Sequence, residues 1–343
     1  MENYRFLRAC FGETTDTVPI WIMRQAGRYM PEYQEVRQKH SFMEMCKTPD
    51  LAVKVTLLPV DILGVDAAIL FSDILIPVEA MGIPVEFVEG KGPVLGAKIR
   101  DESDVERLAE FDPAEKTGFV MEAVRILRKE LEGKVPLIGF SGAPFTLASY
   151  IVEGGSSKNF IKLKTLMYQA PDIYRKLMSK LTRVVTDYLN AQIEAGAQAV
   201  QLFDTWAGIL TPSDYREYVL PYTRKVIANL KRDEVPVIHY ANDSATLLPL
   251  FRELGADVYG IDWRINLDDA VEALGGDVVV QGNMDPTALF YPVEKIEKIA
   301  GDIIARGRKA RAHIFNLGHG ILPTTDPEHA RALVEAVHRL GKK

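Results

Sequence analysis

PDIYRKLMSKLTRVVTDYLNAQIEAGAQAVQLF, residues 171–203, holds one complete structural unit of this chain. Apolar side chains recur at three- and four-residue intervals over 171–195, which predicts an amphipathic helix. Gly196 follows, where a helix C-cap is expected. The short apolar run 198–203 then suits a strand that is buried on both faces, as in a parallel sheet. The stretch therefore predicts a helix that leads into a parallel β-strand.

The same unit recurs on both sides of this stretch. Alternating strands and helices predict a parallel sheet, and the number of units favours closure into a single-domain (β/α)8 TIM barrel over residues 1–343. An open doubly wound sheet is the competing fold, but the glycine-rich phosphate fingerprint that would favour it is missing after the first strand. Strands are expected at 18–23, 66–71, 136–140, 198–203, 235–240, 257–261, 277–281 and 312–316.

Helical patterns occupy the segments between these strands. Glycines at 64, 196 and 255 stand where C-caps are expected. The first three crossovers are long, so insertions are expected in the early βα loops, with a β-hairpin within 76–100. The helices are expected at 49–63, 117–132, 171–195, 244–254, 267–274 and 327–340.

Composition limits the kinds of partner. The 343 residues are 47% hydrophobic and carry a net charge of −6, so a general surface for nucleic acid is not expected. Cys10 and Cys46 are too few for a disulfide framework. The sequence has no apolar run of about 20 residues for a membrane span and no signal-peptide core at its N-terminus. A reduced cytoplasmic protein is expected.

The strand ends carry the candidate functional residues, because TIM barrels place their chemistry at the C-terminal ends of the strands. The first strand leads into Arg24 and Arg28, and guanidinium groups bind carboxylates and phosphates through paired hydrogen bonds. An arginine pair on a solvated loop is the alternative. The other strand ends supply hydroxyls, aromatics and single acids, namely Ser72, Asp73, Ser141, Tyr150, Asp204, Thr205, His239, Asp262, Asn283, Asn316 and His319.

These strand ends predict chemistry without a metal or a cofactor. His239 is followed two positions later by Ala241, not by Cys, and no group of His and carboxylate residues meets at one loop. No strand ends in a Schiff-base lysine or a GxSxG serine. Structural roles are the alternatives for several strand-end residues: helix caps for Asp73 and Thr205, a packed aromatic for Tyr150, a loop residue for His319, and supports of neighbouring loops for Asp204 and Asp262.

Six segments, in order from residue 19 to residue 323, resemble the uroporphyrinogen decarboxylase family. They are PIWIMRQAGRYMPEY (19–33), FSDIL (71–75), IGFSGAPFTLASYIVEGG (138–155), QLFDTWAG (201–208), QGNMDP (281–286) and NLGHGILP (316–323). The resemblance covers essentially the whole chain. It implies a TIM barrel, cytoplasmic haem biosynthesis, decarboxylation without a cofactor and usually a homodimer.

The resemblance also implies roles for single residues. The substrate, uroporphyrinogen, carries four acetates and four propionates, and Asp73 matches the central aspartate that accepts hydrogen bonds from its pyrrole N–H groups. Protonation of a pyrrole ring carbon creates the cation that takes up the electrons of the departing carbon dioxide, and a carboxylate stabilises that cation. The implied contacts are Arg24, Arg28, Arg37, Tyr150 and His319 to carboxylates, Phe140 and Phe203 to the macrocycle, and Thr205 in place of a family serine.

One departure from the family pattern, the identity of the general acid and two alternative functions stay open. Trp206 stands where some members of the family carry His, so no proton-transfer role is assigned to that position. The general acid is an arginine, a water molecule or a carboxyl group of the substrate. A corrinoid-dependent methyltransferase of the same barrel superfamily would need a zinc-binding His-x-Cys pair, which reads His239-x-Ala241 here. A non-catalytic tetrapyrrole carrier would need the arginines but not Asp73.

Overall fold

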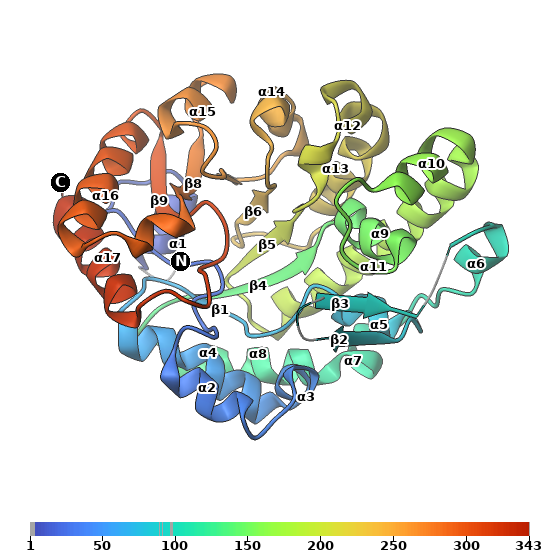
Figure 1. Ribbon diagram of the computed structural model, residues 1–343, viewed down its shortest axis with the longest axis horizontal. Helices are drawn as coiled ribbons and strands as arrows, with labels where there is room; N and C mark the ends of the chain where they lie inside the picture. The colour runs from blue at the N-terminus through green and yellow to red at the C-terminus, as the bar shows by residue number, and fades with distance from the viewer. Residues whose placement is uncertain (1–3, 89, 91, 97–98, 343) are drawn as a thin grey trace.

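The computed structural model describes residues 4–88, 90, 92–96 and 99–342. Helices surround a curled parallel sheet of seven strands in the order β1-β4-β5-β6-β7-β8-β9 (Figure 1). The predicted α/β barrel architecture is confirmed. The strands are β1 (Ala68–Ile69), β4 (Leu137–Gly142), β5 (Ala199–Phe203), β6 (Val237–Tyr240), β7 (Val258–Gly260), β8 (Val279–Met284) and β9 (Ala312–Leu317).

The predicted first strand, 18–23, is wrong as a regular strand. It forms a single parallel bridge, Ile20 to Phe315 of β9. The backbone N–H of Phe315 donates to Pro19 O at 2.8 Å, and on the other side Asp66 N donates to Ile20 O at 2.7 Å. The segment therefore lies between β9 and the residues that precede β1, and it closes the sheet into a barrel.

In this closing segment, side chains accept hydrogen bonds from backbone N–H groups that would bond to a neighbouring strand in a regular sheet. The Asp66 carboxylate accepts the N–H of Ile20 at 2.8 Å, and Gln25 Oε1 accepts that of Ile22 at 3.0 Å. Asn316 Oδ1 accepts the N–H of Met23 at 2.9 Å. Because these backbone groups bond to side chains, the segment makes few of the strand-to-strand bonds that define a regular strand.

Most predicted helices are confirmed. The bounds agree at both ends for α4 (Pro49–Leu63), α11 (Pro171–Ala195) and α17 (Pro327–Leu340), and α8 (Gly118–Glu130) and α15 (Leu267–Ala273) differ slightly from the prediction. The remaining helices are α1 (Arg5–Cys10), α2 (Pro31–Arg37), α3 (Phe42–Lys47), α5 (Ile76–Ala80), α6 (Glu102–Glu106), α7 (Pro113–Lys116), α9 (Pro144–Glu153), α10 (Ile161–Gln169), α12 (Pro212–Tyr218), α13 (Leu220–Ala228) and α16 (Val293–Gly307), with short 3-10 helices η1 (Ala207–Ile209) and η4 (Pro286–Phe290).

The predicted helix 244–254 is wrong as a continuous element. It is divided into η2 (Ala245–Leu247), α14 (Leu248–Phe251) and η3 (Arg252–Leu254). Pro249 has no N–H to donate to the preceding turn, so it stands in the first turn of α14 and ends the helical pattern before it. The C-cap predicted at Gly255 is confirmed, with φ of 76°, as are those at Gly64 and Gly196.

A hairpin of β2 (Val85–Val88) and β3 (Gly92–Leu95) confirms the predicted insertion after β1. Leu95 N donates to Gly154 O at 3.1 Å, just past the end of α9. A Cβ on Gly155 would lie 2.8 Å from Pro93 O, so this glycine permits the close approach. The hairpin thus supports α9, the helix that carries Tyr150.

The N-terminal end of the barrel is filled and covered. Apolar side chains from the strands, among them Ile138, Ile238 and Ile314, pack with Phe6 and Leu7 of α1. Such a barrel is a packed core and not a pore, so its site is expected at the opposite end. In the described part of the chain, no helix has the length and apolar character needed to cross a bilayer.

Candidate active site

Arg24 is the first residue beyond the barrel wall. It has a φ of 64°, a left-handed conformation that is uncommon for a residue other than glycine. Its stem packs on Gly320, because a Cβ on Gly320 would lie 2.4 Å from Arg24 Cδ. Ile321 N donates to Met23 O at 2.9 Å and fixes the two segments side by side. The exposed guanidinium of Arg24 is therefore placed next to the loop that contains His319.

Asp73 lies after the end of β1. Its Oδ1 accepts the N–H of Leu75 at 2.8 Å, but the cap expected as the structural alternative is wrong, because Leu75 occupies the N-cap of α5, which begins at Ile76. Part of the side chain stays accessible, yet burial of the carboxyl raises its pKa from 3.8 to about 6, against the N–H of Leu75 and the charge of Arg24, which both lower it. Asp73 is a carboxylate with a perturbed pKa within electrostatic reach of an arginine.

Tyr150 extends the same site from α9. Burial raises the pKa of its phenol, the nearby Trp206 side chain opposes that change, the charge of Asp73 adds to it, and the charge of Arg24 lowers it. Its ring meets Trp206 edge-on, with 6.0 Å between the ring centres. Tyr150 packs as the structural alternative expected, and it also lies within electrostatic reach of Asp73 and Arg24.

His319 is partly buried in the loop after β9. Burial, together with the positive charges of Arg24 and Arg264, lowers its pKa from 6.5 to about 4. The imidazole is therefore neutral near pH 7 and offers one donor and one acceptor. Its ring lies between those of Tyr240 and Trp263, with centre-to-centre distances of 6.4 and 6.3 Å.

An aromatic surface connects the ends of three neighbouring strands. Phe140 of β4 and Phe203 of β5 meet edge-on at 5.5 Å, and Phe203 meets Tyr240 of β6 at 6.0 Å. Tyr240 donates to Gly318 O at 2.7 Å, which joins this surface to the loop of His319. An apolar surface beside charged groups can receive the ring of an organic anion whose carboxylates point outward.

Arg28 and Arg37 lie near Tyr33, at the side of the site formed by α2. Both are exposed, and Arg37, at the end of α2, donates to His40 O at 2.9 Å. Both charges act on Tyr33, whose ring packs against Phe71 at 5.8 Å. Phe71 precedes Asp73 by two residues, so the structure places this pair beside α2, next to the end of β1.

Thr205, Asp204 and Asp262 have distinct surroundings. The cap expected of Thr205 is wrong, because Trp206 occupies the N-cap of η1. Asp204 is fully buried and accepts from Thr146 Oγ1 at 3.1 Å, and Asp262 accepts from the backbone of Asp243 and Arg264. Asp262 supports the loops after β6 and β7, as the alternative for it predicted, whereas the side chain of Asp204 bonds to helix α9.

Among the described residues, no group of three His, Cys, Asp or Glu side chains is arranged to hold a metal ion. His239 is buried and lies 3.9 Å from Asp204 through its Nε2. Cys10 and Cys46 are both buried and unpaired.

The residues that converge at this end of the barrel suit binding of a polycarboxylate, and Asp73 is the group suited to stabilising positive charge.

Arg264 is a charged neighbour of His319 that the sequence analysis missed. It follows β7 in IDWRIN just as Arg24 follows the closing segment, so the strand-end criterion was sufficient to find it. Asp262, two residues earlier, was identified instead, and only as a support for a neighbouring loop.

Comparisons with known proteins point to one family. The uroporphyrinogen decarboxylase family model matches residues 1–340. A uroporphyrinogen decarboxylase of Trichlorobacter lovleyi is 56% identical over 99% of this chain and 100% of its own length. One from Geobacter metallireducens is 55% identical with the same coverage. Among solved structures, a methyltransferase from Methanosarcina mazei has a TM-score of 0.82 over 98% of this chain and 97% of its own, at 22% identity, a likeness of fold.

Proposed function

The chain belongs to the uroporphyrinogen decarboxylase family, and on that premise we propose that Arg24, Arg28, Asp73, Tyr150 and His319 form its active site. The reaction is the removal of the four acetate carboxyl groups of uroporphyrinogen III as carbon dioxide, which yields coproporphyrinogen III. The enzyme is a carboxy-lyase of tetrapyrrole biosynthesis. We further propose that it uses neither a metal nor a cofactor.

Binding comes first. The substrate carries eight carboxylates, and a protein with a net charge of −6 needs local positive charge to hold it. Arg24 supplies a guanidinium at the loop of His319, and neutral His319 supplies a hydrogen bond without a charge. Phe140, Phe203 and Thr205 are assigned to the macrocycle. Arg28 and Arg37, beside α2, are assigned to carboxylates at the rim.

The chemical step needs an electron sink. Protonation of the ring carbon adjacent to the one that bears the acetate turns the pyrrole into an iminium-like cation. The carbon–carbon bond to the carboxylate then breaks, carbon dioxide leaves, and the electron pair neutralises the cation by forming an exocyclic methylene. A proton converts this methylene into a methyl group, and loss of the proton added to the ring restores the pyrrole. Asp73 is assigned to the pyrrole N–H groups, where its charge favours the cation.

The magnitude supports this assignment. A carboxylate about 4 Å from a unit positive charge contributes about 4 kcal/mol at an effective dielectric constant of about 20. If that attraction arises only in the transition state, it corresponds to roughly a thousandfold in rate. The single observation that carries the proposal is the half-buried Asp73, whose pKa burial raises to about 6 and which lies within electrostatic reach of both Arg24 and Tyr150.

A direct test is to incubate the purified, metal-free protein with chemically reduced uroporphyrin and separate the products by chromatography. We expect stepwise loss of four carboxyl groups and release of carbon dioxide. An octacarboxylate that is bound but returned unchanged would favour the tetrapyrrole carrier. Turnover that requires added zinc and a corrinoid would favour the methyltransferase alternative, for which His239-x-Ala241 lacks the cysteine.

The assembly and location of the enzyme are part of the proposal. The family resemblance supports a homodimer, and light scattering after gel filtration measures its mass against the 38.3 kDa of one chain. A cytoplasmic location is supported by the bacterial biosynthetic enzymes that the chain resembles. Cell fractionation with an antibody to the protein tests that location.

A further inference from the structure

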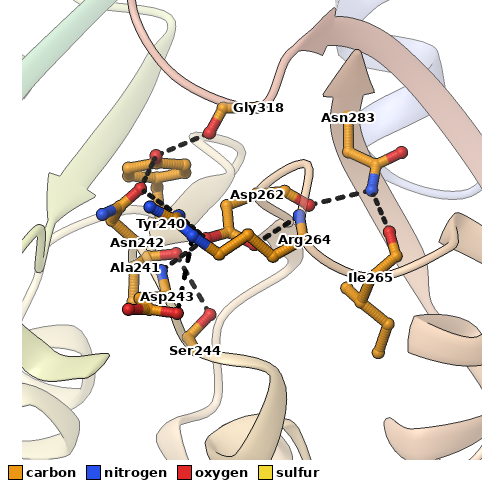
Figure 2. Close-up of polar contacts among 10 residues, drawn as sticks. All are labelled: Tyr240, Ala241, Asn242, Asp243, Ser244, Asp262, Arg264, Ile265, Asn283 and Gly318. Atoms are coloured by element: carbon orange, nitrogen blue, oxygen red, sulfur yellow. Dashed lines mark hydrogen bonds and ion pairs between the residues drawn. The ribbon is translucent and has the colours of Figure 1, made fainter. Parts of the chain in front are cut away.

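A polar cluster joins the ends of β6, β7, β8 and β9 beside the proposed active site (Figure 2). Its centre is Asp262, whose side chain is only 1% exposed. The carboxylate accepts from the backbone of Asp243 and from Arg264 N at 3.2 Å. It also accepts from Arg264 Nη1 at 2.6 Å, which completes a buried anchor for that guanidinium.

The guanidinium of Arg264 is fixed on one side and open on the other. It lies over the ring of Trp263, 4.1 Å from the ring centre, and Nη1 also donates to Asn242 Oδ1 at 3.2 Å. Nε lies 3.6 Å from Asp243 Oδ1, beyond hydrogen-bond distance. Within the described ranges no group accepts from Nη2, and 38% of the side chain is exposed.

Arg264 and Arg24 act on the same imidazole. Both charges lower the pKa of His319, and both oppose the effect of burial on the pKa of Tyr240. The loop of His319 lies directly against Trp263, because a Cβ on Gly318 would come 2.4 Å from Trp263 N. Arg264 is therefore next to the active site, on its β6–β7 side.

We propose that Arg264 binds a carboxylate of the tetrapyrrole and that Asp262 is its positioning residue, a proposal that rests on the function assigned above. A fixed planar fork loses little conformational freedom when it binds a carboxylate. Asp262 uses one edge of the guanidinium, and the Nη2 side keeps donors for a ligand. The charge of Asp262 is buried and committed to the anchor, and the exposed Asp243 forms an ion pair at Nε, so the donors left for a ligand are those on the Nη2 side.

Steady-state kinetics with reduced uroporphyrin test this role in Arg264→Gln and Arg264→Lys. We expect Arg264→Gln to raise KM about tenfold with kcat within about threefold, because a charge-assisted hydrogen bond to a non-reacting carboxylate is lost. Arg264→Lys keeps the charge without the fork and should fall between. Arg216→Gln is the matched control, since Arg216 is also half-exposed and paired with an acid, Glu253, on the surface. Its KM should equal that of the wild type.

Equilibrium binding separates this proposal from the proposed function. Quenching of tryptophan fluorescence by oxidised octacarboxylate porphyrin reports affinity without turnover. If the wild type binds the probe but does not decarboxylate, weaker binding by Arg264→Gln still supports the role of Arg264. Turnover and a KM within twofold of the wild type in Arg264→Gln would overturn it while leaving the function intact. A wild type that neither binds nor reacts would remove both.

Asp262→Asn provides the second arm. A positioning role predicts that its KM rises toward that of Arg264→Gln and that the double variant is no worse than Arg264→Gln alone. A purely structural role would instead lower the melting temperature of Asp262→Asn and leave KM unchanged, which would overturn the assignment of Asp262.

Discussion

The side chain of Arg24 lies directly on Gly320, so that a Cβ at position 320 would stand 2.4 Å from Arg24 Cδ. Arg24 crosses the loop after β9 at Gly320, and glycine is the one residue type that leaves room for the stem of the arginine. The position of the guanidinium is therefore set by the absence of a side chain at residue 320, as well as by the unusual φ of Arg24.

Gly320→Ala tests this contact. The added methyl group displaces the stem of Arg24, so we expect kcat/KM for uroporphyrinogen to fall by about tenfold to a hundredfold while the fold is kept. Gly118→Ala is the control, because a Cβ at that position meets nothing within 4 Å. Equal kcat/KM in Gly320→Ala and wild type would show that the position of Arg24 does not matter for turnover.

Asp73→Asn preserves the shape of the side chain and removes its charge. We expect turnover to fall by two or more decades, because the cationic pyrrole loses its counter-charge. Circular dichroism should show an unchanged fold, since Asn retains an oxygen for the N–H of Leu75. A variant with wild-type turnover would remove Asp73 from the mechanism.

The raised pKa of Asp73 also makes a stability prediction. The carboxyl has a pKa of about 6 in the folded protein against its ordinary value of 3.8, so the folded state takes up the proton first as the pH falls. Asp73 therefore costs stability above about pH 6, and this cost disappears below about pH 4. We expect Asp73→Asn to be more stable than wild type by about 1–3 kcal/mol at pH 8, with no difference at pH 4. Urea denaturation at the two pH values measures this, and equal stability at pH 8 would contradict it.

The pH profile of the reaction follows from the same group. Only ionised Asp73 stabilises the cation, so kcat/KM should rise with pH up to a plateau, with an acidic limb near 6. His319, with a pKa of about 4, stays neutral across this range and should add no limb of its own. An Asp73→Asn profile that kept the limb near 6 would assign it to another group.

Asp66 is expected to matter for stability and not for chemistry. It accepts from Ile20 N at 2.8 Å, Arg5 Nη1 at 2.9 Å and His338 Nε2 at 2.7 Å, far from the strand ends that carry the site. Asp66→Ala should lower the free energy of unfolding by about 2–4 kcal/mol, because the buried N–H of Ile20 loses its acceptor. Asp61→Ala, on the exposed face of α4, is the control. A wild-type denaturation midpoint in Asp66→Ala would show that the barrel closes without this carboxylate.

The sequence predicted most helices because their ends carry local signals. Pro171 and Gly196 delimit α11 and need no tertiary information. The strand at 18–23 was predicted too regular, because the bonds from Asp66 and Asn316 join residues distant in sequence and leave no periodic trace. At 244–254 the apolar pattern predicted one continuous helix although the segment contains Pro249, whose missing N–H breaks the helix.

The site was predicted in part for related reasons. Strand-end position identified Arg24, Asp73 and His319, and the charge of Arg24 acts on each of the other two. It also identified Arg28, whose charge acts on Tyr33. It could not predict these neighbours, because residues beyond a strand end follow paths that the strand does not determine. Arg264 was missed because Asp262, two residues earlier, was interpreted as a support for this loop, and no further role was sought in the segment.

Between neighbouring strands elsewhere in the barrel, backbone atoms of any residue type can make the bonds. Along the closing segment, such backbone bonds are few, and three particular side chains supplement them, from Gln25, Asp66 and Asn316. Closure of the barrel therefore depends on which residues stand at these three positions, and a substitution at any of them would change how the closing segment fits between β9 and β1. Because Arg24 is the first residue after the closing segment, the same substitution would also move its guanidinium. Closure of the barrel and affinity for an anionic substrate are therefore expected to be constrained together in evolution.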